Sequence, residues 1–347
     1  MDLTQFSTLI LIITFLFSTI AIWFAGIKII SAIDAITLHF NLGEAFGGMV
    51  FLAIVTNLPE IAITAVAAYH HNYDIAVSNL LGGIAIQTVV LVLIDAFGVG
   101  RKAPLTLKGH SNVLVLEGVA LIFILTMVMM AKQFSPNIIF FRTTPFEWLI
   151  LFIWLGSVYL ISRFVDVVKK EKKIVTDPTH HLRHPKARFK GNIQLAISIF
   201  IICAVVTLIA GSALEVTGDV LSKRFGMSGV LFGGTILALC TSLPEISTGI
   251  ASAKIREYQM AVSDIFGGNA FLPVLFLMAS IIGGDAILPS LQPSDMYLTG
   301  LGIILTGIYL IGMVMHSKKQ FFRMGIDSII VLLVYVIGLV GLLFLVN

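Results

Sequence analysis

The chain has few charged residues and only two cysteines. Charged side chains make up 12% of its 347 residues, hydrophobic ones make up 58%, and the mean hydropathy is +1.01. Soluble domains carry roughly 25% charged residues. The composition therefore excludes a soluble globular protein and indicates a chain that crosses a membrane several times. Cys203 and Cys240 both fall in apolar stretches, so no disulfide framework is indicated.

The apolar stretches also lack the residue patterns of an enzyme. No nucleophile is paired with a histidine base, and no histidine-rich metal motif occurs within them. We therefore expect no enzymatic activity and no cofactor. The net charge of +3 is explained below by membrane topology, and it gives no reason to expect nucleic-acid binding.

Ten apolar runs are long enough to cross the ~30 Å hydrocarbon core as helices. The sequence therefore predicts an all-α polytopic membrane protein with ten transmembrane helices. The predicted spans are 7–30, 45–69, 75–97, 112–131, 146–163, 193–213, 229–252, 260–282, 296–315 and 326–346.

Lysine and arginine are unevenly distributed between the loops. If the long polar segment is cytoplasmic, alternation through ten spans places 18 of the 22 Lys and Arg residues inside. Both termini are then outside. We expect an integral protein of the cell membrane whose basic linker can touch anionic lipid. The oligomeric state stays open, a homo-oligomer included.

A repeated motif divides the chain into two halves. Thr56-Asn57-Leu58-Pro59-Glu60 returns as Thr241-Ser242-Leu243-Pro244-Glu245, and residues 56–85 match residues 241–270 at 13 of 30 positions without a gap. A polar linker at 163–192 separates a first repeat, 1–162, from a second, 193–347. Because each half has five spans, the repeats are expected to be inverted relative to one another, as in many secondary transporters.

The repeated motif brings together the oxygen ligands of a cation site. A carboxylate inside a membrane is costly and needs a compensating partner. Pro59 and Pro244 lack an N–H, which frees a backbone carbonyl in each half. Thr56 shares a helix face with Glu60, and Thr241 does so with Glu245. Calcium takes about 6 to 8 oxygen ligands, which two halves together could supply.

A second polar segment follows in each half. It contains Ser78-Asn79 before Gly82-Gly83, and Ser263-Asp264 before Gly267-Gly268-Asn269. Small residues four apart allow close helix packing, so these polar groups are expected near the Pro-Glu helices. Asp264 would be a third intramembrane acid. Other acids, among them Glu117, Glu147 and Glu215, lie near predicted span ends and are expected at the interfaces.

The chain resembles the sodium/calcium exchanger membrane region of the calcium/cation antiporter superfamily, with its two alpha repeats. The family motif is close to G-T-S-L-P-E, followed by G-N-x-x-G-S-N. The resemblance implies a ten-helix inverted-repeat fold that exchanges calcium for sodium or protons. By position it implies side-chain calcium ligands at Thr56, Glu60, Thr241 and Glu245, and carbonyl ligands at Ala53 and Ala238. Asn57 and Ser242 occupy the third motif position.

The chain departs from this family pattern at several positions. The family's Gly-Ser becomes Gly82-Gly83 and Gly267-Gly268, which removes a serine hydroxyl from each half, and the following asparagine is kept only as Asn269. The candidate cation site comprises Glu60, Glu245, Thr56, Thr241, Asp264, Asn57, Ser242, Asn79, Ser78, Ser263, Asn269, Ala53 and Ala238.

Three functions remain to be compared. The leading hypothesis is calcium:sodium exchange at a carboxylate-lined midplane site with alternating access. The alternative is exchange of calcium, or another divalent cation, for protons. A passive cation channel is less favoured, because the sequence shows no selectivity-filter loop.

Overall fold

The computed structural model describes residues 5–40, 46–100, 103–133, 142–175 and 192–346. Within these ranges the chain is a bundle of helices with one short β-hairpin. The first part of the chain forms α1 (Thr8–His39), α2 (Phe46–Thr56), α3 (Leu58–Tyr69), α4 (Tyr73–Ile94), the π-helical turn η2 (Asp95–Val99), α5 (Leu105–Lys108), α6 (Asn112–Ala131) and α7 (Pro145–Val175).

The second part repeats this order with more interruptions. It forms α8 (Ile193–Arg224), α9 (Gly229–Leu231), η3 (Phe232–Leu237), α10 (Ala238–Thr241), α11 (Leu243–Lys254), α12 (Tyr258–Phe271), η4 (Leu272–Val274), α13 (Leu275–Gly283), η5 (Leu288–Ser290), α14 (Pro293–Met315), β1 (Gln320–Phe321), β2 (Met324–Gly325) and α15 (Ile326–Val346). The hairpin β1–β2 was not predicted from the sequence.

Eight helical stretches of the described chain are long and apolar enough to cross a membrane on their own. Two further stretches are bent pairs, Met49–Thr56 with Leu58–Tyr69 at 61°, and Gly229–Thr241 with Leu243–Lys254 at 44°, which bring the number to ten if each pair is one span. The prediction of a helical polytopic membrane fold is confirmed in this form. The predicted spans 45–69 and 229–252 are broken rather than continuous.

The breaks lie at the repeated motifs. Asn57 (φ −98°, ψ 21°) precedes α3 and Ser242 (φ −84°, ψ 1°) precedes α11, and a proline follows two residues later in each case. Proline has no N–H to donate within the helix and clashes with the preceding turn. Each span therefore continues as a new helix, and the glutamate of the motif lies in the first turn of that helix.

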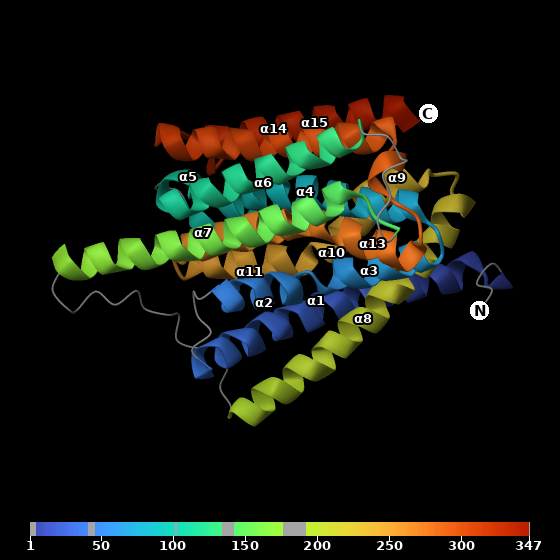
Figure 1. Ribbon diagram of the computed structural model, residues 1–347, viewed down its shortest axis with the longest axis horizontal. Coiled ribbons are helices and arrows are strands. Elements are labelled where there is room, and N and C mark those ends of the chain that lie inside the picture. Colours follow the sequence, from blue (N-terminus) through green and yellow to red (C-terminus); the bar gives the residue numbers. More distant parts are fainter. Residues whose placement is uncertain (1–4, 41–45, 101–102, 134–141, 176–191, 347) are drawn as a thin grey trace.

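The helices lie side by side in a bundle (Figure 1), with α14 and α15 at one edge and α1 and α8 at the opposite edge. Helix α1 begins and α15 ends at the same end of the bundle. α1 and α8 pack against each other and run in opposite directions. Their directions follow from the hydrogen bond that Arg224 Nη1, at the end of α8, donates to Thr8 Oγ1, at the start of α1, over 2.9 Å. Their outward side chains, such as Phe17 and Ile209, are exposed and apolar, as a lipid-facing surface requires.

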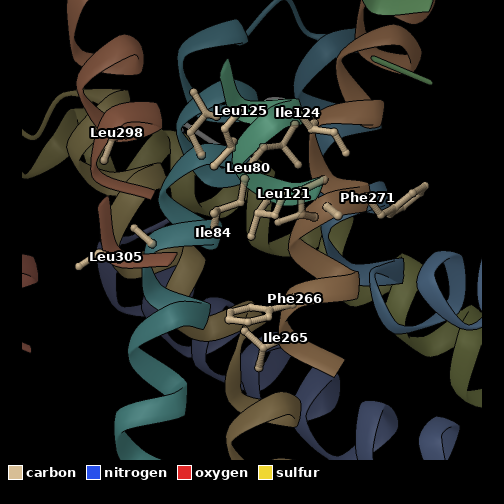
Figure 2. Packing of buried hydrophobic residues seen from close by; sticks show 14 of the residues in the cluster. Leu80, Ile84, Leu121, Ile124, Leu125, Ile265, Phe266, Phe271, Leu298 and Leu305 are labelled. Atoms are coloured by element: carbon tan, nitrogen blue, oxygen red, sulfur yellow. The ribbon is translucent and has the colours of Figure 1, made fainter. Parts of the chain in front are cut away.

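Two spans form the centre of the bundle. In Tyr73–Val99 and Tyr258–Gly283, 78% of the most apolar window is buried, compared with 17% in Ile193–Arg224 and Ile326–Val346. Figure 2 shows the main apolar cluster, in which side chains of α4 and α12 meet those of α6 and α14. The labelled members are Leu80, Ile84, Leu121, Ile124, Leu125, Ile265, Phe266, Phe271, Leu298 and Leu305.

Buried carboxylates tie helix ends together. Asp95 accepts hydrogen bonds from Leu105 N at 2.8 Å and from Gly325 N and Ser328 Oγ at 2.7 Å each. Glu147 accepts from Thr144 N and from Ser280 Oγ of α13. Glu117, Glu147 and Glu215 were expected at the interfaces, but they are at most 5% exposed. Neighbouring helices cover these side chains, so a position near the end of a span does not mean exposure to solvent.

The end of the first half extends further than the predicted span. Helix α7 continues to Val175, whereas its membrane-length apolar part ends at Val165. Residues 163–175 of the predicted linker are therefore helical. Residues 176–191 lie outside the described residues.

We predict that Gly82→Ala destabilises the protein. A Cβ at Gly82 would overlap the Gly234 Cα atom, where α4 and η3 approach backbone to backbone. Overpacking of this kind costs about 1–3 kcal/mol, more than the roughly 0.5–1 kcal/mol that alanine contributes over glycine in a helix. Gly156→Ala is the matched control, since a Cβ there meets nothing within 4 Å. Thermal unfolding of the purified protein in detergent should show a lower midpoint for Gly82→Ala only; equal midpoints would contradict the packing described here.

Candidate cation site

Glu60 and Glu245 come from different halves of the chain and interact electrostatically inside the bundle. Each is the third residue of its helix, α3 or α11, directly after the break. Their exposed fractions are 0% and 5%, and the two carboxylates are close enough to interact electrostatically. Two like charges buried together repel one another. The arrangement is therefore stable only with a cation or a proton between them.

The two carboxylates have few hydrogen-bond donors. Gln87 Nε2 donates to Glu60 Oε1 at 3.4 Å, and the Thr241 hydroxyl lies beside the Glu60 carboxylate. Oε2 of Glu60 and Oε2 of Glu245 have no hydrogen-bond partner in the described chain. A buried carboxylate oxygen without a donor costs free energy, so these two atoms are the natural contacts for a bound cation.

Asp264 is the third acid that the sequence placed in the site. It interacts electrostatically with Glu245 and is half-buried on α12. Within the described ranges, however, no three His, Cys, Asp or Glu side chains lie close enough to hold one metal ion. Asp264 thus adds negative potential near Glu245 without completing a cluster of three acids.

The remaining motif residues hold the broken helix ends. Thr56 Oγ1 donates to Leu52 O at 3.0 Å, and Asn57 Nδ2 donates to Ala53 O at 2.7 Å. In the second half, the hydroxyls of Thr241 and Ser242 donate to Ala238 O at 3.0 and 2.8 Å. The carbonyls of Ala53 and Ala238, which the resemblance implied as ligands, therefore already accept hydrogen bonds from the motif. Each carbonyl oxygen has a second lone pair that can contact a cation.

The second polar segment only partly reaches the carboxylate pair. Ser78 Oγ donates to Asp74 O and Gly229 O, and Ser263 Oγ donates to Glu117 Oε1 at 2.8 Å. Both hydroxyls thus donate hydrogen bonds to other helices and not to Glu60 or Glu245.

The two asparagines of this segment are fully buried. Asn79 has neither a donor nor an acceptor partner in the described chain, and Asn269 Nδ2 donates to Ile84 O at 3.3 Å while its Oδ1 has no partner. These amides keep oxygens free for a further ligand.

A small pocket lies beside Glu245. It is lined by Thr56, Thr207 and Glu245 together with apolar residues of α1, among them Gly26 and Ile30. Hydroxyls in these helices usually donate to the carbonyl four residues earlier, as in Thr19 to Phe15 at 2.9 Å. Thr207 Oγ1 is buried and has no partner in the described chain. Sequence reasoning missed Thr207, because one threonine in an apolar helix gives no signal of which way it points.

The two glycines that replace the family's serines have different surroundings. A Cβ on Gly268 would lie 3.5 Å from Asn57 Nδ2 and 4.0 Å from Gln87 Oε1, whereas a Cβ on Gly83 would lie 3.6 Å from Leu272 Cδ1. One half therefore has polar groups at this position and the other half has an apolar one.

The chain is similar to known membrane transporters in sequence and in fold. The family model for the sodium/calcium exchanger protein matches residues 10–166 and again residues 195–344, which together cover most of the chain. The chain belongs to the sodium/calcium exchanger family. It is therefore a member of the calcium/cation antiporter superfamily, a group of membrane transporters and not of enzymes.

Individual relatives agree with this placement. The chain is 24% identical over 309 residues to the inner membrane protein YrbG of Escherichia coli (strain K12), covering 83% of this chain and 91% of that protein. Its fold is similar to that of the sodium-calcium exchanger NCX_Mj, with a TM-score of 0.59 at 18% identity over 96% of this chain and 99% of the other. It is also similar to the H+/Ca2+ exchanger CAX, with a TM-score of 0.66 at 14% identity over 96% and 87%.

We predict that Ser78→Ala and Ser263→Ala leave cation affinity unchanged. Their hydroxyls bond to Gly229 O and Glu117, away from the carboxylate pair. Thr241→Val, which removes the hydroxyl beside Glu60, should instead raise the calcium concentration for half-maximal uptake. Uptake of radiolabelled calcium into proteoliposomes measures this value for each variant. If either serine variant is expressed normally but has a weaker apparent affinity for calcium, that serine contributes to the cation site.

Proposed function

We propose that this protein is a secondary active cation antiporter that exchanges calcium for sodium at Glu60 and Glu245. The observation that carries the proposal is the electrostatic interaction of these two buried carboxylates, one from each half, with an unpartnered oxygen on each in the described chain. Thr56 and Thr241, and the carbonyls of Ala53 and Ala238, supply further oxygens. Calcium prefers such oxygen ligands and tolerates irregular geometry.

The proposal includes an inverted repeat of two five-span units, 1–162 and 193–347, joined by the linker 163–192. In its support, α1 and α8 begin and end 185 positions apart, as do α3 and α11. α1 and α8 also run in opposite directions. Asn269 bonds to the carbonyl of Ile84, its own equivalent in the first repeat. A pseudo-twofold axis between the repeats brings Glu60 and Glu245 together near mid-membrane.

Alternating access follows from this symmetry. Movement of one helix group against the rest would expose the carboxylate pair first to one face of the membrane and then to the other. Because calcium and the returning ion need the same carboxylates, neither crosses without the other. The distribution of Lys and Arg among the loops supports an orientation with both termini outside. The membrane that we propose is the cell membrane.

The counter-ion has a second candidate, the proton. The observation in its favour is the glycine at both serine positions of the family pattern, which removes at Gly268 a hydroxyl that would lie beside Asn57 and Gln87. A smaller oxygen set disfavours sodium. Glu60 and Glu245 could then return protons instead.

The first test uses Glu60→Gln and Glu245→Gln, singly and together. Each removes a negative charge while keeping the size of the side chain, so calcium uptake should fall to background in all three variants. Proteoliposomes loaded with sodium, or acidified inside, and diluted into radiolabelled calcium provide the two driving gradients. Glu257→Gln, a change in the loop before α12, serves as the control. Wild-type exchange rates in both single variants would disprove the site.

The two gradients also separate the two counter-ions. Uptake driven by an outward sodium gradient supports calcium:sodium exchange, whereas uptake driven only by an outward proton gradient supports the alternative. Calcium currents that need no gradient of a second ion would indicate a channel.

We predict that Gly268→Ser strengthens sodium coupling. Its hydroxyl would lie beside Asn57 and Gln87, which adds an oxygen to the polar side of the site. Gly83→Ser is the matched control, because the same hydroxyl there faces Leu272. The sodium concentration inside proteoliposomes that gives half-maximal calcium uptake should fall for Gly268→Ser and stay unchanged for Gly83→Ser. Equal responses would show that Gly268 does not adjoin a sodium position.

A further inference from the structure

A short hairpin connects the last two long helices of the chain, α14 and α15. Its strands, β1 and β2, pair Phe321 with Met324, and only Phe322 and Arg323 lie between the paired residues and form the turn. Both helices are long and apolar enough to cross a membrane. The hairpin therefore lies where these two spans leave the membrane on the same face.

The turn has a backbone conformation that its residues do not favour. Phe322 has a φ of 51° and Arg323 has a φ of 70°. A two-residue hairpin turn with positive φ at both positions is of type I′, for which Asn-Gly is a preferred sequence. Side chains as large as phenylalanine and arginine adopt this left-handed conformation only at a cost in free energy. Such strained residues cluster at functional sites.

The tip of the hairpin is apolar. Phe321 and Phe322 are 62% and 79% exposed, and their rings pack against each other with centroids 4.4 Å apart. The hairpin thus presents a pair of aromatic rings outside the bundle. Because α14 and α15 end beside it, the medium around this tip is the boundary between the lipid headgroups and the acyl chains, where phenylalanine side chains are readily buried.

Positive charge surrounds the aromatic tip. Lys318, Lys319 and Arg323 are all exposed. None of the three pairs with an acid of the described chain, in which the salt bridge found is that of Lys223 with Asp219. Basic residues beside a span attract the anionic headgroups of the cytoplasmic leaflet. This face of the bundle is the inner one in the topology proposed above.

The base of the hairpin is joined to the central helix α4. Gly325 N donates to Asp95 Oδ2 at 2.7 Å, and Asp95 directly follows the last residue of α4. The same helix carries Gln87, which donates to Glu60. A ligand that holds the hairpin in place therefore also holds the end of a helix that contacts the carboxylate pair.

We propose that this hairpin is a binding site for anionic phospholipid of the inner leaflet. Phe321 and Phe322 insert between the headgroups, while Lys318, Lys319 and Arg323 bind the anionic headgroups themselves. The bound lipid fixes the hairpin against the end of α4, so anionic lipid stabilises the folded protein more than zwitterionic lipid does. This inference does not depend on which ions the protein exchanges.

The first test measures thermal unfolding of the purified full chain in detergent with added phosphatidylglycerol or phosphatidylcholine. Phosphatidylglycerol should raise the unfolding midpoint, because a ligand of the folded state stabilises it, and phosphatidylcholine should not. In Lys318→Gln/Lys319→Gln, the phosphatidylglycerol concentration that gives half of this rise should increase about tenfold or more, since each basic residue near an anionic surface contributes about fivefold in affinity. No rise in the wild-type protein would disprove the site.

Lys254→Gln/Arg256→Gln is the matched control, because it removes two exposed positive charges from the same end of the bundle. Gln259, at the start of α12, donates to His110 O, and the His110 ring packs against His316 at the end of α14. An equal loss in both double variants would indicate a general attraction of the positive face and overturn the hairpin site. An equal rise of the wild-type midpoint with potassium phosphate would indicate a site for free phosphate and overturn it as well.

A second test exchanges the turn. Phe322→Asn/Arg323→Gly introduces the sequence that a type I′ turn prefers. Without lipid the midpoint should rise, because the backbone strain is removed, whereas the response to phosphatidylglycerol should weaken, because an aromatic ring and a charge are lost. If this variant keeps the full response to phosphatidylglycerol, the tip does not bind the lipid.

A third test measures the depth of the tip in a bilayer. Phe322→Cys, in a chain whose Cys203 and Cys240 are replaced by alanine, is spin-labelled and reconstituted in vesicles that contain phosphatidylglycerol. The label should collide more with oxygen, which concentrates in the membrane, than with a water-soluble nickel chelate. Lys254→Cys, exposed at the same end of the bundle, provides the water-facing comparison. Equal access of the nickel chelate to both labels would contradict insertion.

Discussion

The repulsion between the buried carboxylates of Glu60 and Glu245 determines how the surrounding helices are arranged. Two buried carboxylates that repel one another are stable only with a cation or a proton to offset the charge. The fold places them there by giving each half a helix that stops and restarts at a proline, so that the acid lies in the first turn of the new helix. The positive end of each helix dipole then partly offsets the negative charge.

Close packing around the pair explains several of the glycines. Gly82 touches Gly234, and Gly26 approaches Pro244, with a Cβ there 2.6 Å from the proline Cγ. These contacts bring α4 and α1 close to the two parts of the second broken span, Gly229–Thr241 and Leu243–Lys254. The side chains of α4 can then reach the carboxylates, as Gln87 does for Glu60. The central position of α4 and α12, compared with the lipid-exposed α8 and α15, follows from the same requirement.

Much of this arrangement was predictable from the sequence, because the span lengths, the breaks at Pro59 and Pro244 and the pairing of Glu60 with Glu245 depend on local patterns and on the repeat. The rest depends on which way a side chain faces. Ser78 and Ser263 have the spacing of site residues, yet their hydroxyls bond to Gly229 and Glu117. Glu117 and Glu215 lie near span ends, yet neighbouring helices cover them. Hydropathy gives the depth of a residue along a span but not its neighbours across the bundle.

A crystal soaked in strontium would show whether Glu60 and Glu245 share one cation. Strontium is a calcium analogue with a usable anomalous signal. We expect one strong anomalous peak within roughly 2.3–2.8 Å of carboxylate oxygens from both residues, slightly beyond the usual calcium range. A peak bound to only one of the two carboxylates, or located elsewhere with the pair empty, would contradict it.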